Sequence, residues 1–278
     1  MGRSAIALRF RLIKWIATFG LGALAALCCN AAARAADPIK IGFSASLTGG
    51  LASSGKANLL AQQIWRERVN ADGGTALLFP TAVHGYTPHH LHFPGSVTLR
   101  WNVFVEYLLD LGRSLCHHGF DRILMVNGHG SNQPLVDIAA RLVNVEHPSA
   151  ICASSWYLVT PESKKLLEEL RESGRGGMAH ACELETSLYL AIEPGLVQME
   201  RAVKEIPPQT EYMWMDWSDG PLSYMPHWSA LSQSGVTGDA TLATAEKGSR
   251  WLARAQDEIA QFICEVRDRA HPQPVDHH

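Results

Sequence analysis

The chain has 278 residues, of which 46% are hydrophobic and 18% are charged. This composition is typical of a globular protein and excludes an intrinsically disordered chain, and the length suits one large α/β domain or two small ones. The net charge of −3, with no basic block beyond the N-terminus, argues against nucleic acid as a partner. The 13 histidines are many for this length and indicate metal or proton chemistry.

The first 35 residues have the features of a secretory signal peptide. A basic segment over residues 3–14 precedes an apolar stretch over residues 15–27, and small residues at Ala33 and Ala35 mark a cleavage site. The alternative is an uncleaved membrane anchor, for which the apolar stretch is short. We therefore expect cleavage after Ala35, no stable membrane span afterwards, and a periplasmic or secreted protein.

The cysteines of the remaining chain favour a different compartment. They are Cys116, Cys152, Cys182 and Cys264. Their scattered positions, without paired spacing, are typical of the free thiols of a cytoplasmic enzyme and not of a secreted disulfide scaffold. The sequence thus leaves open whether the protein is exported or cytoplasmic.

Beyond residue 35 the apolar pattern alternates between strand and helix periods. Strands are predicted over residues 38–47, 75–83, 121–127 and 149–159. Helices are predicted over residues 56–70, 101–119, 133–146 and 161–173, in the second part of 174–192, and over 245–269. This order predicts an α/β fold with a mostly parallel sheet covered on both faces, where ligands bind beyond the carboxyl ends of the strands.

His129 stands between Gly128 and Gly130 at the carboxyl end of the strand predicted over residues 121–127. The glycines let the backbone bend where a side chain would clash, and imidazole is a ligand for Zn, Fe or Mn. The motif by itself is compatible with a metal ligand and with an ordinary loop residue.

A second motif, "MAHACELETSLYL", places His180, Glu183 and Ser187 on one face of a helix. A carboxylate that binds a metal and a histidine that transfers a proton would be a sensible pairing. The alternative is a surface capping cluster, in which Glu183 and Glu185 lie near a helix N-terminus where negative charge is favoured.

The segment "HGYTPHHLHFPGSVTL", residues 84–99, is predicted to be a long loop with four histidines. These are His84, His89, His90 and His92. Two of them can reach a metal if the loop folds over the sheet. The alternative, which we favour from the sequence, is a solvated loop without metal contact.

Four motifs in order resemble the creatininase family of metal-dependent amidohydrolases. They are "GYTPHHLHFPGSVTL", "RILMVNGHGSN", "HACELETS" and "SGVTGDATLATAEKG". The resemblance covers roughly residue 75 to the end of the last helix. It implies a three-layer α/β/α sandwich, assembly as a hexamer, and hydrolysis of a non-peptide C–N bond in a small, often cyclic, amide with a pair of divalent metals (Zn, Mn or Fe).

The resemblance also implies roles for particular residues. His129 and Glu183 would bind metal, and His180 would transfer the proton. The residues implied to shape the substrate pocket are Tyr86, His90 and Thr98, and those implied to support the site are Asn132 and Glu185.

The N-terminal part departs from this family. Its members carry a Glu-x-His pair and an Asp after the first strand, and no such pattern occurs before Thr75. Residues 1–74 instead resemble the start of the periplasmic binding proteins for branched-chain amino acids. The resemblance lies in the signal peptide and, in the fragment over residues 36–74, in "IKIGFSASLTGGLASSGKANLLAQQIWRERVNADGG". The sequence therefore predicts a fusion at Gly74–Thr75, in which the foreign strand takes the place of the first strand of the creatininase-like domain, residues 75–278.

This departure affects the expected activity. The hydroxyl groups of the N-terminal loop are poor substitutes for carboxylate or imidazole ligands. We expect a creatininase-like amidohydrolase with weak metal binding and greatly reduced turnover. The alternatives are a fusion product without catalysis and an exported fragment that binds a small amino acid.

Overall fold

The computed structural model describes residues 39–44, 76–82, 84–217 and 220–278. At its centre lies a four-stranded sheet in the order β2-β1-β3-β4, in which every neighbouring pair is parallel. The strands are β1 (Ile39–Ser44), β2 (Ala76–Leu78), β3 (Arg122–Asn127) and β4 (Ile151–Ser155). The predicted first strand therefore lies inside the sheet, between β2 and β3.

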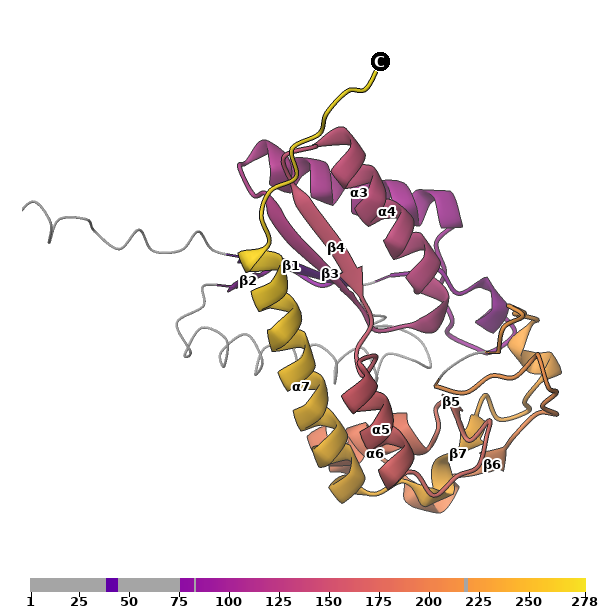
Figure 1. Ribbon diagram of the computed structural model, residues 1–278. Helices are drawn as coiled ribbons and strands as arrows, with labels where there is room; N and C mark the ends of the chain where they lie inside the picture. Colours follow the sequence, from indigo (N-terminus) through magenta and orange to yellow (C-terminus); the bar gives the residue numbers. More distant parts are fainter. Residues whose placement is uncertain (1–38, 45–75, 83, 218–219) are drawn as a thin grey trace, which may run out of the picture. The chain divides into compact units, whose positions relative to one another are not determined.

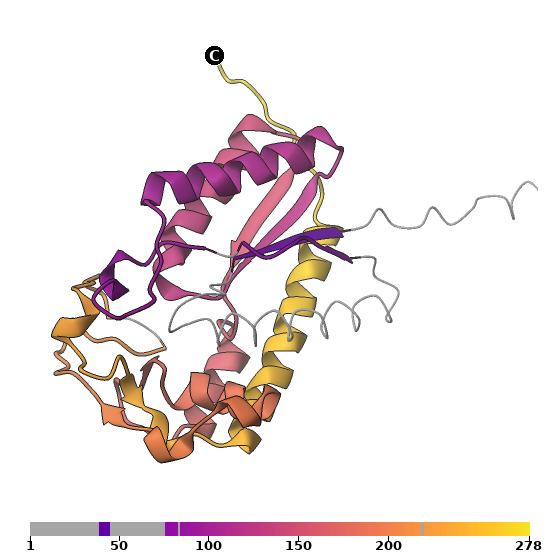
Figure 2. The ribbon, with the colours of Figure 1, turned by 180° about the vertical axis from the view of Figure 1, so that it is seen from behind.

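Helices cover both faces of this sheet (Figure 1), because β3 is apolar on both sides. Its Ile123 and Met125 pack with α3 (Trp101–His117) and α4 (Gln133–Glu146) in one buried cluster. Its Leu124 and Val126 pack with the C-terminal half of α7 (Ala245–Asp268) in another. The view from behind shows the same order of layers (Figure 2). The predicted α/β/α sandwich is confirmed.

The N-terminal half of α7 extends past the sheet, and two shorter helices pack on it. These are α5 (Pro161–Leu170) and α6 (Glu183–Ile192). Trp251 of α7 is fully buried there, in one cluster with Leu167 and Leu184. The 24 residues of α7 make it about 36 Å long, so one helix joins the two apolar clusters.

A second, antiparallel sheet of three short strands was not predicted. Its order is β5-β7-β6, from β5 (Met178–His180), β6 (Lys204–Glu205) and β7 (Thr237–Asp239). The predicted strand over residues 149–159 ends at Ser155, and Leu158 takes a left-handed conformation with φ 57°. The remaining short 3-10 helices are η1 (Pro88–His90), η2 (Gly130–Asn132), η3 (Pro194–Leu196), η4 (Met199–Arg201), η5 (Trp228–Ala230) and η6 (Ala240–Leu242).

Several predictions concern residues outside this description. The signal peptide, the helix over residues 56–70 and the junction at Gly74–Thr75 all lie in segments that the structure does not describe. Among the described helices, none combines the length and the apolar character that a membrane crossing needs. The cysteines at positions 116, 152, 182 and 264 are free thiols, as the sequence predicted.

Candidate active site

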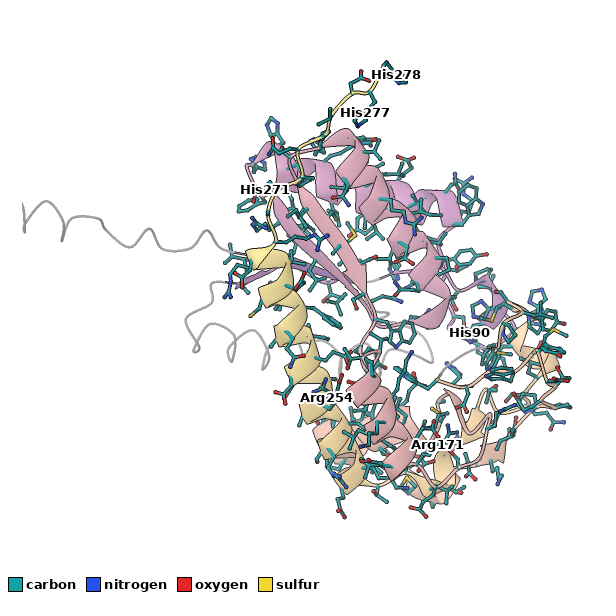
Figure 3. The ribbon with its side chains drawn as sticks, viewed as in Figure 1. His90, Arg171, Arg254, His271, His277 and His278 are labelled. Atoms are coloured by element: carbon teal, nitrogen blue, oxygen red, sulfur yellow. The ribbon has the colours of Figure 1, made fainter. Side chains whose placement is uncertain are left out.

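Three histidines meet beyond the carboxyl end of β3. His129 follows this strand, and His89 and His90 form the end of η1 in the loop that precedes α3. His90 is labelled in Figure 3. Each offers one ring nitrogen, and these three nitrogens all lie within 4.8 Å of one another. Among the described residues, this is the group of side chains that can hold a metal ion. We call it the histidine cluster.

Burial distinguishes the four histidines of the loop over residues 84–99. His89 and His90 are only 6% and 5% exposed. The interpretation as a solvated loop is therefore wrong for these two residues. His92 is exposed, stacks on His227 with ring centroids 4.3 Å apart, and contacts the Ser229 hydroxyl through Nδ1 at 2.6 Å.

His180, which ends β5, and Trp228, in η5 between β6 and β7, pack against the histidine cluster. The ring centroid of His90 lies 4.9 Å from that of His180 and 4.9 Å from that of Trp228. His180 and Trp228 are 5.1 Å apart, in an edge-to-face arrangement. Trp228 is 4% exposed, and its Nε1 donates to the carbonyl of Gly235 at 3.0 Å, so the indole is held in place.

Burial keeps these four imidazoles neutral at pH 7. Desolvation first, and then the neighbouring imidazoles, lower the pKa of His90 to about 2 and that of His129 to about 3. Desolvation also lowers the pKa of His89 and of His180 to about 4, with smaller contributions from His227 and from His89 respectively. A neutral imidazole has a lone pair, which can bind a metal or accept a proton.

Hydrogen bonds around the end of β3 determine where His129 lies. The buried side chain of Asn127 accepts from the His129 amide at 3.1 Å and donates to the His129 carbonyl at 2.8 Å. The Ser131 hydroxyl donates to the carbonyl of Tyr86 at 2.7 Å and lies 2.9 Å from His129 Nδ1. The turn after β3 and the histidine-rich loop are thereby joined.

Two of the residues predicted to shape or support the pocket hold the backbone of the loop over residues 84–99. Asn132 accepts from the Tyr86 amide at 2.9 Å, and a Cβ at Gly85 would come within 2.7 Å of the Asn132 side chain. The Thr98 hydroxyl accepts from the Thr87 amide at 2.8 Å. Thr98 and Asn132 therefore fix the loop, and His90 alone of the predicted pocket residues belongs to the histidine cluster.

Glu183, which was predicted to bind the metal, has other partners in the structure. Glu183 is fully buried, and its Oε1 lies 2.6 Å from Lys247 Nζ. Its two oxygens also accept from the amides of Glu172 and Ser173, each at 2.9 Å. The carboxylate is thus satisfied by the start of α7 and by the loop after α5, and it is not part of the histidine cluster.

Glu185 lies next to the turn that follows His180. Its Oε2 accepts from the Ala181 amide at 2.5 Å, and Ala181 has a left-handed φ of 47°. Burial raises the pKa of Glu185 to about 7, against the lowering effect of this hydrogen bond. The side chain braces a backbone conformation that is costly for alanine and sets the direction of the chain after His180.

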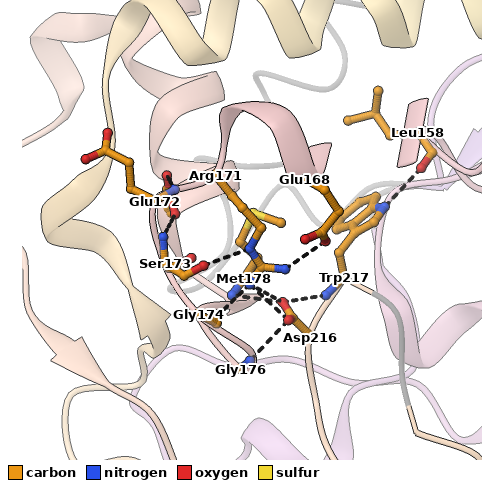
Figure 4. A network of polar contacts seen from close by, with 11 residues as sticks. Leu158, Glu168, Arg171, Glu172, Ser173, Gly174, Gly176, Met178, Asp216 and Trp217 are labelled. Carbon is orange, nitrogen blue, oxygen red and sulfur yellow. Dashed lines mark hydrogen bonds and ion pairs between the residues drawn. The ribbon is translucent and has the colours of Figure 1, made fainter. Parts of the chain in front are cut away.

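Asp216 anchors the chain before His180 (Figure 4). Its Oδ1 accepts from the amides of Met178 at 3.2 Å and Trp217 at 3.0 Å, and its Oδ2 accepts from Arg171 Nη2 at 3.0 Å. Met178 begins β5, the strand that ends at His180. The sequence motifs did not indicate this network, because Arg171 and Asp216 are 45 residues apart.

An aromatic group stands beside the site and was also missed. Trp156 packs on Tyr157 with ring centroids 5.7 Å apart and meets Trp217 edge-to-face at 5.5 Å. A Cβ at Gly130 would contact Trp156 at 3.4 Å, which places this ring beside the turn that carries His129. Trp217 Nε1 donates to the carbonyl of Leu158 at 3.0 Å (Figure 4). The sequence shows these aromatic residues, but it does not show that they pack together beside the turn that carries His129.

The chain is similar to proteins of known activity. It is 28% identical over 212 residues to the 3-dehydro-scyllo-inosose hydrolase of Thermotoga maritima, covering 67% of this chain and 64% of the relative. It is 30% identical over 191 residues to the mycofactocin precursor peptide peptidase of Mycobacterium ulcerans, covering 67% of this chain and 65% of the relative. The chain thus spans just under two thirds of the length of these two relatives. It is 28% identical over 205 residues to the creatinine amidohydrolase of Pseudomonas putida, covering 68% and 75%.

Solved structures share the fold. A crystal structure of creatinine amidohydrolase superposes with a TM-score of 0.67 at 23% identity, covering 85% of this chain and 93% of that one. Creatininases described as Zn–Zn type and as Mn also match, each with a TM-score of 0.67 at 22% identity, covering 84% of this chain and 92% and 93% of theirs. At this identity the likeness concerns the fold.

A family model decides the lineage. The model described as creatininase, creatinine amidohydrolase, matches residues 49–263. The match begins ahead of the predicted junction at Gly74–Thr75, and no comparison supports a fusion with a binding protein. The match covers most of the chain, which therefore belongs to the creatininase family.

Proposed function

We propose that this protein hydrolyses a C–N bond of a small, cyclic amide at the histidine cluster, with the help of a divalent metal. Membership of the creatininase family and similarity to a creatinine amidohydrolase support an amide as the substrate. One observation supports the proposal most strongly. Three ring nitrogens that can bind a metal lie close together, and a fourth imidazole, that of His180, packs against them.

The residues fit a divalent metal. Their ring nitrogens converge within 4.8 Å, and His90 Nε2 is buried without a hydrogen-bond partner among the described residues. A buried polar atom without a partner is costly, and a metal ligand bond would satisfy it. When bound, the metal supplies Lewis acidity, which polarises a carbonyl and activates water. His89, His90 and His129 would hold it.

His180 is the residue that we assign to proton transfer. It is neutral at pH 7 and its ring lies against that of His90, so it can accept a proton from the attacking water. It would return this proton to the departing nitrogen of the amide. Trp228, packed on both rings, keeps bulk water away from this exchange.

Turnover should be low. In the part of the chain that the structure describes, no carboxylate joins the histidine cluster, so nothing there bridges a second metal. A centre with one metal lacks the clamp that two metals place on the attacking and leaving atoms.

Hydrolysis of cyclic amides by the full chain tests the proposal. After loading with Zn²⁺, creatinine and a panel of lactams and hydantoins are followed by mass spectrometry for the gain of one water. We expect a slow, metal-dependent gain with at least one of these rings. His180→Gln should lower kcat by about 10²–10⁴-fold with KM little changed, as for loss of a general base.

The matched control is His118→Gln, at an exposed histidine directly after α3. It should leave kcat unchanged. The proposal fails if no ring gains water in the metal-loaded protein, or if His180→Gln and His118→Gln have the same kcat.

A further inference from the structure

We propose that His89, His90 and His129 form a site for a single metal ion, bound through imidazole nitrogens alone and selective for zinc-type metals over manganese and magnesium. The proposal rests on the proposed function for the place of the site, but it concerns how many ions bind and which. It differs from the paired metals that the family resemblance implied.

The hydroxyl of Ser131 determines which nitrogen of His129 is free. This hydroxyl has one hydrogen, and it donates that hydrogen to the carbonyl of Tyr86 at 2.7 Å. In its 2.9 Å contact with His129 Nδ1 it must therefore accept, so Nδ1 carries the proton. The lone pair of His129 is then on Nε2, and this nitrogen is the one that can bind a metal. Outer partners commonly orient metal-binding histidines in this way.

The Nδ1 of His90 also faces a hydroxyl group, and its Nε2 faces the histidine cluster. Its Nδ1 lies 2.5 Å from the Thr87 hydroxyl. Thr87 is itself held by the hydrogen bond that its backbone amide donates to the Thr98 hydroxyl. Its Nε2 is buried and has no partner among the described residues. The residue is only 5% exposed, so water satisfies this atom poorly. An ion at the histidine cluster would satisfy it.

The charge of the site argues for one ion. Three neutral imidazoles carry no negative charge, and two neighbouring divalent cations would repel each other without a bridging anion. The acidic residues on α6 nearest in sequence to His180 are engaged elsewhere. Glu183 pairs with Lys247, and Glu185 accepts from the Ala181 amide.

The ligand type argues for the kind of ion. Imidazole suits Zn²⁺, Co²⁺, Ni²⁺ and Cu²⁺, whereas Mg²⁺ and Mn²⁺ are bound mainly by carboxylates and other oxygen donors. Three histidines with a fourth position open to water or substrate are also a known arrangement of catalytic zinc. We therefore expect a four-coordinate site with one open position.

Metal binding to the metal-stripped full chain tests this directly. Titration calorimetry and elemental analysis should give one equivalent of Zn²⁺, bound at least about tenfold more tightly than Mn²⁺, in line with the order of divalent metals for such ligands. Co²⁺ should give the intense visible bands of a four-coordinate centre. His89→Gln, His90→Gln and His129→Gln should each lower Zn²⁺ affinity by about a hundredfold or more.

Two further variants make the test specific. Ser131→Ala, which removes the partner that fixes the His129 proton, should lower Zn²⁺ affinity by about 10–100-fold. His92→Gln, in the same loop but exposed and outside the histidine cluster, should leave it unchanged. Circular dichroism spectra should match those of the parent chain for every variant that is compared.

Binding of two equivalents, tighter binding of Mn²⁺, or Zn²⁺ affinity that survives His89→Gln and His90→Gln would each overturn the proposal. These results are separate from the proposed function. If these histidines bind one Zn²⁺ and no hydrolysis is seen, the single-metal site is supported and the proposed hydrolysis is rejected. If the protein hydrolyses an amide with two bound metals, the proposed hydrolysis is supported and the single-metal site is rejected.

Discussion

Replacing Glu183 by glutamine distinguishes a structural carboxylate from a metal ligand. In the structure this side chain is fully buried and takes hydrogen bonds from Lys247 and from the amides of Glu172 and Ser173. Glutamine has the same shape but no charge, and its NH₂ group would face a donor. We expect Glu183→Gln to destabilise the fold and to leave metal affinity unchanged.

The magnitude follows from the burial of the ion pair. Breaking a buried pair by neutralising one partner costs about 3–5 kcal/mol. Lys247 keeps its bond to Glu172 at 2.6 Å and one to the Leu242 carbonyl at 2.9 Å, so the lower end applies, about 3 kcal/mol. For a domain of this size, each kcal/mol changes Tm by about 2–4 °C, which gives a fall of about 6–12 °C.

The pH dependence has a defined sign. Burial opposes ionisation of Glu183, but the hydrogen bonds from Lys247 and Ser173 outweigh it, and the pKa is lowered. The stabilisation is therefore complete above the unfolded pKa of about 4.3 and is lost as the pH falls through the lower folded pKa. The difference in stability between the parent chain and Glu183→Gln should shrink as the solution is acidified.

Urea denaturation and thermal melts at several pH values measure this, beside Zn²⁺ titration of the same variants. Lys247→Met serves as the reciprocal variant, and the double variant should cost less than the sum of the two. The reasoning is refuted if Glu183→Gln melts within about 2 °C of the parent chain, a change of less than ~1 kcal/mol. It is also refuted if this variant loses Zn²⁺ while its stability stays unchanged.

Two further predictions concern packing and the anchor of β5. Gly248→Ala should lower the free energy of unfolding by about 1–3 kcal/mol in urea, although alanine favours helices, because the new Cβ would lie 1.8 Å from the Ser187 carbonyl oxygen. Gly195→Ala, which meets open space, should change it by less than ~0.5 kcal/mol, and equal effects would refute the close contact of α6 and α7. Asp216→Asn should cost about 3 kcal/mol, the lower end of the range for a broken buried pair, because the buried Arg171 keeps its ion pair with the exposed Glu168. It should also lower kcat by displacing β5, and a variant with unchanged stability and kcat would refute this role.

The sequence predicted the elements whose signal is local. The apolar run of β3 and the helical periods of α3, α4 and α7 are properties of single segments, and the structure shows all four close to the predicted bounds. The place of His129 followed in the same way, because a residue after a parallel strand lies at the edge where ligands bind. The strands of the second sheet have only two or three residues each, too few for a period to be recognised.

What only the tertiary structure decided is which polar groups meet. Glu183 pairs with Lys247, 64 residues further along the chain, and its local motif did not indicate this partner. His89 and His90 carry no local mark that separates them from His92. They are buried because Trp228 packs on both rings, while His92 faces solvent. The physical reason is the same in each case. Local sequence determines where helices and strands form. Burial and pairing of side chains arise between segments that are distant in the chain, and they decide whether an imidazole or a carboxylate is free to bind a metal.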